Sequence, residues 1–230
     1  ATTGDVNRIL SKRIEGKHYN DYGANQSIIV CNAANPPSTR NLLPVLSQGL
    51  GQGNRIGNAV RVRSSKLVVF VNVTSAASDI AATPTMIRVW IVSSKILNTN
   101  APASLQFTDF FQLGSSNSGF QGNMLDMLFP VNTDNWTVYM DKTIKVGLGS
   151  IPATNVNNNY PDNSSFNHKF EFDWSDNFKS KLDYDDAPTE VTNRNLFMVY
   201  CACRSDGASA TAGTTIAEFH FTNNVIYEDA

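Results

Sequence analysis

Alternation of apolar and polar residues dominates the chain after its first segment. Val60 and Val62 alternate with Arg61 and Arg63, and similar runs recur up to the last residues. A period of two places every second side chain on one face of a β-strand, so it is typical of strands with one buried face. The pattern predicts strands over 27–31, 59–74, 86–92, 107–113, 136–146, 166–174, 196–203 and 216–227.

The amino end follows a different period. Apolar residues at helical spacing begin after Asp5, which can cap a helix, and end before Gly16, which can stop one. The opposite side of this helix is basic and carries Arg8, Lys12, Arg13 and Lys17. We therefore expect two parts, a short basic helix over 1–17 and a β domain over 18–230.

The order of the elements predicts the fold class. Eight strands with one helix indicate a single all-β domain with antiparallel sheets. The loops are longer than plain hairpins require, which favours Greek-key or jelly-roll connections. We predict an eight-stranded antiparallel jelly-roll sandwich with a short amino-terminal helix.

Composition limits the kinds of partner. Charged residues make up 17% of the 230, and the net charge is -2, so binding to nucleic acid would need a local basic patch. No apolar run approaches the roughly 20 residues of a membrane helix, and we expect no membrane partner. The odd number of cysteines, Cys31, Cys201 and Cys203, argues against a disulfide framework and predicts buried free thiols.

Enzyme motifs are not found in the sequence. It has no Walker loop, HExxH, GxSxG or calcium-loop pattern, and its three histidines lack ligand spacing. Paired carboxylates do occur, Asp173 with Asp176 and Asp183 with Asp185, and leave a sandwich-fold glycosidase as a remote alternative. We expect no catalytic residues and no enzyme activity.

One stretch carries a family resemblance. Residues 48–71 contain Gln48-Gly49, Arg55-Ile56-Gly57, Val60-Arg61-Val62 and Lys66-Leu67. This run resembles the start of strand B in coat proteins of satellite tobacco necrosis virus and its relatives. It is also similar to capsid proteins of small circular single-stranded DNA viruses. Weaker matches follow in order: the amino-terminal helix, 87–92 as strand C, 136–141 as strand E, and the last four residues.

The resemblance implies a structural capsid protein. Sixty copies would form a T=1 shell around a single-stranded genome, RNA or DNA, with the helix facing inward. The protein would be found in the virion and be assembled inside the host cell; its host receptor stays unknown. Arg8 and Arg61 match positions that contact RNA in the family. Helical geometry adds Lys12 and Arg13, and a shared strand face adds Arg63, whereas Lys66 has the opposite parity.

The resemblance also implies calcium at a subunit interface. The matching ligands are the carboxylates of Glu15 and Asp229 and backbone carbonyls near Ile56 and Ala59. Calcium takes several oxygen ligands, some of them carbonyls, so the set is chemically suitable. Asn58 stands where the family has an aspartate.

A second function class stays open beside the capsid. A non-viral β-sandwich that binds ligands as a lectin-like or cytokine-like oligomer would share the strand pattern. It would lack a basic inner helix and would not form shells.

Overall fold

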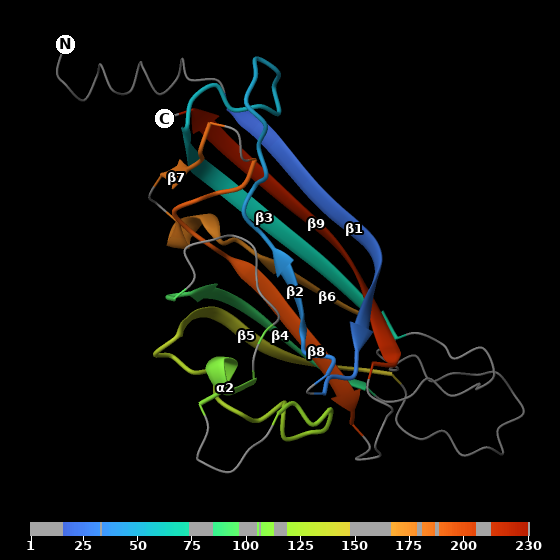
Figure 1. The fold of residues 1–230 in the computed structure, drawn as a ribbon. Helices are drawn as coiled ribbons and strands as arrows, with labels where there is room; N and C mark the ends of the chain where they lie inside the picture. The colour runs from blue at the N-terminus through green and yellow to red at the C-terminus, as the bar shows by residue number, and fades with distance from the viewer. Residues whose placement is uncertain are drawn as a thin grey trace, which may run out of the picture.

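The computed structural model describes residues 16–32, 34–73, 85–96, 105, 107–112, 119–147, 167–178, 181–186, 189–205 and 213–229. These form two antiparallel sheets (Figure 1). The first sheet has the order β1 (Lys17–Ile29), β9 (Thr215–Asp229), β3 (Ala59–Val73) and β6 (Asn167–Phe172). The short β7 (Leu182–Asp183) also pairs with β3. The second sheet has the order β2 (Ser38–Asn41), β8 (Phe197–Arg204), β4 (Thr85–Ser94) and β5 (Trp136–Val146).

The strand pairs are nested. Apart from the two-residue β7, the first strand pairs with the last, the second with the next to last, the third with β6, and the fourth with the fifth. A long hairpin whose two arms wrap together into a pair of sheets gives this order, and it is the jelly roll. The predicted fold class, an eight-stranded antiparallel jelly-roll sandwich, is confirmed.

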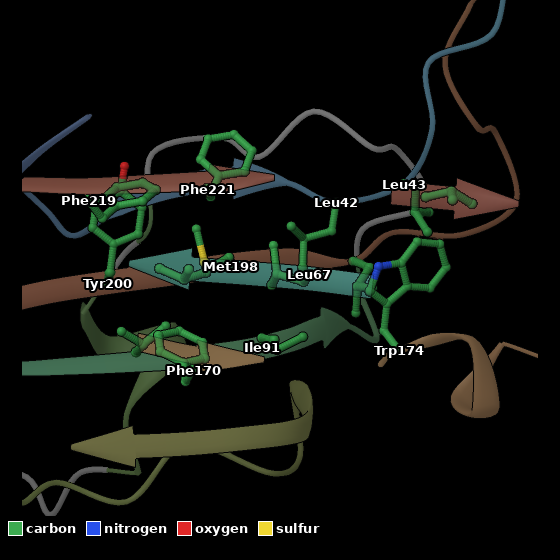
Figure 2. Close-up of a cluster of buried hydrophobic side chains, with 14 of the residues drawn as sticks. Leu42, Leu43, Leu67, Ile91, Phe170, Trp174, Met198, Tyr200, Phe219 and Phe221 are labelled. Atoms are coloured by element: carbon green, nitrogen blue, oxygen red, sulfur yellow. The ribbon is translucent and has the colours of Figure 1, made fainter. Parts of the chain in front are cut away.

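The main core lies between the inner faces of the two sheets. Leu67 and Phe170 of the first sheet point toward Ile91 and Met198 of the second (Figure 2). All four are nearly or fully buried, and burying a side chain of this size stabilises the fold by about 1.5–3 kcal/mol. A cavity beside Val69 has a volume of about 10 Å³, roughly the space of a single water molecule. At this point the side chains of the two sheets therefore leave little space between them.

The two sheets differ in their second faces. In β4 and β8 almost every residue is buried, because their outer side chains join a second cluster under α2 (Phe107–Phe110) and 119–131. Trp90, for example, meets Phe110 edge to face at 5.2 Å. In β3 and β9, buried and exposed residues alternate. The middle strands of the second sheet, β4 and β8, are thus covered on both faces, which explains their continuous apolar runs. The described residues leave the outer face of the first sheet uncovered.

The three cysteines lie in the second cluster as free, buried thiols, which confirms the prediction. A hydrogen bond with Cys31, together with burial, raises the pKa of Cys201. Burial raises the pKa of Cys203 to about 11. A thiol with a raised pKa is a weak nucleophile, so these residues act as small apolar side chains.

Six predicted strands are confirmed, and the remaining parts needed correction. The predicted strand over 107–113 is wrong for its described residues, 107–112, which contain the short helix α2 and an isolated bridge at Phe111. Strand β1 starts ten residues before the predicted 27–31, and β2 lies in a segment predicted as loop. The resemblance placed 59–74 as strand B, the first of a jelly roll; two strands precede it, so it is the third.

The predicted helix over 1–17 falls outside the described residues, apart from Gly16 and Lys17; Lys17 is the first residue of β1. In the described part of the chain, no helix is long and apolar enough to span a membrane.

Candidate nucleic-acid interface

Arg61 and Arg63 project from β3 on the exposed side of the first sheet. Their side chains are 51% and 45% exposed, while Val62 between them and Val60 before them are buried. The predicted shared face of the two arginines is therefore confirmed. This exposed side is called the open face, and it includes Tyr22, Arg61, Arg63, Lys66, Phe70, Lys169, Glu171 and Glu228.

Glu228 holds the two arginines together. It lies opposite Arg61 on β9, and only 7% of its side chain is exposed. Its Oε2 contacts Nη2 of Arg63, and its Oε1 lies 4.0 Å from Nη1 of Arg61. One carboxylate thus serves two guanidinium groups, and the group of three keeps a net positive charge.

Lys66 also points outward on the open face, so the parity argument for it was wrong. The pairing of β3 with β9 shifts between Val62 and Ser64, which leaves Arg63 as an extra residue in β3. Such a β-bulge reverses the inside–outside alternation beyond it. Lys66 consequently joins the side of the sheet that bears Arg61.

A second group of three charges forms around Glu171 on β6. Nζ of Lys66 and Nζ of Lys169 each lie 2.9 Å from a carboxylate oxygen of Glu171. Hydrogen bonds from these two ammonium groups lower the pKa of Glu171 to about 2. This group also keeps one positive charge in excess. Sequence reasoning missed Lys169, whose only signal was its place in the alternating run 166–174.

The other predicted nucleic-acid contacts, Arg8, Lys12 and Arg13, lie outside the described residues. Their role stays a prediction.

The predicted calcium ligands are only partly brought together. Asp229 lies at the end of β9, and its Oδ1 accepts a hydrogen bond of 3.0 Å from the backbone N–H of Ile56. Its Oδ2 lies 2.6 Å from Nζ of Lys17. Ile56 therefore offers Asp229 a donor, while its carbonyl accepts a hydrogen bond from Gln48 at 3.1 Å. Ala59 is paired with Asp183 of β7.

The described residues of this set do not fit calcium by themselves. They supply one carboxylate, and the ammonium group of Lys17 already neutralises it, whereas calcium requires six to eight oxygen ligands. Glu15 lies outside the described residues. Among the described residues, no group of three His, Cys, Asp or Glu side chains could hold a metal ion.

Arg55, part of the motif that carries the resemblance, serves the fold. Its guanidinium group is buried and donates to the carbonyls of Leu46 at 3.3 Å, Gly57 at 2.7 Å and Asp185 at 2.6 Å. It also donates to Oδ1 of Asn58 at 2.9 Å. Arg55 therefore links the glycine-rich segment to the neighbouring loops.

The paired aspartates have structural partners. Oδ1 of Asp173 accepts hydrogen bonds from the hydroxyl groups of Ser65 and Ser175. Burial raises the pKa of Asp173, but hydrogen bonds from Ser175 and Ser65 outweigh this effect and lower it overall. A glycosidase acid needs a raised pKa, so Asp173 is unsuited to that role. Asp183 accepts a hydrogen bond from the amide group of Asn193.

Comparison with known proteins gave structural similarity only. No protein-family model and no curated protein matches the sequence. A structure of Desmodium yellow mottle tymovirus covers 94% of this chain and 87% of its own, with 11% identity and a TM-score of 0.38. The empty head of turnip yellow mosaic virus covers 94% and 82%, with 8% identity and a TM-score of 0.40. Similarity at this level does not establish a shared family.

Proposed function

We propose that this chain is a structural capsid protein that assembles into a small icosahedral shell around a single-stranded genome. The observation that carries the proposal is the complete jelly-roll strand order, an architecture that viral coat proteins share with some lectins and cupins. Within that group, the coat protein is the member that the motifs over 48–71 resemble, although they lead into the third strand and not the first. A T=1 shell of sixty copies, found in the virion and assembled in the host cell, is the form that this resemblance implies.

Two exposed apolar clusters support self-association. Leu50 is 92% exposed and Ile56 is 56% exposed in the connection between β2 and β3. Leu125 and Leu128 are 52% and 73% exposed in the connection between α2 and β5. These connections lie at opposite ends of the subunit (Figure 1). Two different patches at opposite ends suit head-to-tail contacts, which close into rings and shells.

The genome contact is proposed at Arg61 and Arg63 on the open face, with Arg8, Lys12 and Arg13 of the amino-terminal segment. Cations bind the phosphate backbone through charge alone and read no sequence. Such binding suits RNA and DNA alike. Calcium between Glu15 of one subunit and Asp229 also stays a proposal; it would require Lys17 to leave the carboxylate of Asp229.

Negative-stain electron microscopy of the purified protein, with and without a calcium chelator, tests this function. We expect uniform hollow particles. Swelling or disassembly in chelator would support calcium at the interface. Monomers or trimers alone, at high concentration and in calcium, would instead favour the lectin-like or cytokine-like binding module.

A further inference from the structure

The open face carries exposed aromatic side chains beside its cations. Tyr22 on β1 is 76% exposed, and Phe70 on β3 is 39% exposed. Large aromatic rings usually lie in the core, and the residues that flank Phe70 along β3, Val69 and Val71, do lie there. Nothing among the described residues covers the face on which these two rings stand.

The strand register gives the positions of these rings relative to the charges. Phe70 lies directly between Lys169 of β6 and His220 of β9. Tyr22 pairs with Thr222, one row further along the sheet. The positions of Phe70 and Tyr22 are two strand spacings of about 4.8 Å apart across the sheet and one row of about 6.7 Å apart along it. The distance between the two positions is therefore roughly 12 Å.

Both charged groups lie on the same face of β3 as Phe70. Lys66 and Lys169 share Glu171, while Arg61 and Arg63 share Glu228. Each group keeps one positive charge in excess, and the four cations are 45–59% exposed. Cations can therefore contact phosphates at the same time as the rings contact bases.

We propose that the open face is a stacking platform for single-stranded nucleic acid, on which bases stack against Phe70 and Tyr22. The separation of about 12 Å is larger than the rise of about 3.4 Å between stacked bases, so the two rings would receive two different bases of one strand. Exposed aromatic residues on an open β-sheet bind unstacked bases in this way, without reading their sequence. The inference rests on the proposed function for the source of the strand, because it names the surface that would receive the genome.

The test measures binding of the full chain to fluorescent oligo(dT) and oligo(U) of equal length, at several salt concentrations. Variants Phe70→Val and Tyr22→Val keep a strand-forming residue but remove the ring. Each should weaken binding roughly 5-fold to 100-fold, because stacking on one aromatic residue contributes about 1–3 kcal/mol per base. The dependence on salt should stay the same in both variants.

The lysines should show the opposite behaviour. A Lys66→Gln/Lys169→Gln double variant removes two cations and leaves Glu171 unpaired. The slope of log affinity against log salt should fall by about 1.4, since each phosphate contact on a single strand contributes about 0.7. A duplex of the same length should respond to the lysine changes and ignore Phe70→Val.

Matched controls separate the platform from general effects. Phe70→Tyr retains a ring and should bind like the wild type. Lys145→Gln removes an exposed lysine from β5 of the other sheet and should change little. Thermal unfolding of each variant confirms that the fold is intact.

Unchanged affinity in both Phe70→Val and Tyr22→Val, or no binding of oligonucleotides by the wild type, would overturn the platform. Microscopy of the same samples tests the capsid separately. Shells that bind oligonucleotides with no contribution from the rings would keep the proposed function and remove this inference. Subunits that bind oligonucleotides through the rings but never form shells would keep this inference and remove the proposed function.

Discussion

At the scale of single residues, Arg55 shows how much one buried side chain can hold. At least four oxygens accept hydrogen bonds from its guanidinium group, and three of these are the backbone carbonyls of Leu46, Gly57 and Asp185. Its Cζ lies 5.0 Å from the ring centre of Tyr184. Replacing it with Met should lower the free energy of unfolding by on the order of 3 kcal/mol, because buried carbonyls would lose their donors. The melting temperature should fall by roughly 6–12 °C.

Arg55→Lys is the sharper comparison for this residue. It keeps the charge, but an ammonium group cannot reach oxygens arranged around a planar fork. We expect it to melt well below the wild type, and an exposed change, Lys145→Met, to have little effect. Equal melting temperatures for Arg55→Lys and the wild type would show that charge alone holds the segment.

The group around Glu171 predicts a titration with a defined direction. Its pKa is lowered from 4.5 to about 2 by Lys66 and Lys169. A carboxylate with a depressed pKa in the folded state stabilises the fold above the ordinary value, and this contribution is lost as the pH falls toward 2. The carboxyl carbon of Glu171, followed by NMR, should have a midpoint near 2. In the Lys66→Gln/Lys169→Gln variant the midpoint should return toward 4.5; an unmoved midpoint would contradict the paired arrangement.

At the scale of elements, the bulge in β3 decides which residues reach the open face. Arg63 is the extra residue, so its deletion should leave every other pair of β3 and β9 in register. We expect the shortened chain to fold, to melt near the wild type, and to lose about 0.7 from its salt slope for single strands.

Deletion of Val68 provides the control for that experiment. It removes an outward residue beyond the bulge, so it would turn Lys66 inward and Leu67 outward. This chain should fail to fold, as judged by circular dichroism. Equal tolerance of both deletions would mean that the register of β3 is not fixed by its buried face.

The strands differ in how well the sequence predicted them. Alternation located β3 and β9 well, because one face of each is buried, and continuous apolar runs located β4 and β8. The alternation of apolar and polar residues does not reveal the bulge at Arg63. For this reason the orientation of Lys66 was predicted wrongly. Residues 107–113 are rich in apolar side chains because they cover the second sheet, and burial alone does not distinguish a helix from a strand.

Two parts of the candidate site could not be predicted from the spacing of residues along the sequence. The ion pair of Lys17 with Asp229 joins the two ends of the described chain, and no spacing along the sequence brings them together. The partners of Glu228 depend in the same way on the register of β9 against β3. The alternating pattern predicted some of the side chains on the open face. The pairing of distant strands determines which of these side chains contact one another.

At the scale of the whole molecule, the two sheets differ in how far the rest of the described chain covers them. The strands β4 and β8 of the second sheet are covered on both faces, whereas the described residues leave one face of the first sheet uncovered. The exposed apolar clusters lie in the connections at the two ends of the molecule. A subunit with ends that bind neighbours and a face left for nucleic acid can do both at once.

The clusters at the two ends therefore predict how assembly can be stopped. Leu50 is 92% exposed and Leu128 is 73% exposed in the single subunit, so Leu50→Asp and Leu128→Asp should change its melting temperature little. Each should abolish particles in the microscope, because a carboxylate buried in a contact without a partner is strongly unfavourable. Leu50→Val, which keeps an apolar side chain, should still assemble.

Mixing separates head-to-tail contacts from symmetric ones. In a head-to-tail contact, a Leu50→Asp subunit still presents an intact Leu128 end, so it can add to a growing assembly and then block the next subunit. When a small fraction of the subunits carries this change, the yield of particles should fall by a larger fraction than the fraction of variant added. Light scattering measures this yield. A reduction in simple proportion to the added variant would argue that the two clusters do not meet each other. Normal particles from both Asp variants would remove these clusters from the subunit contacts altogether.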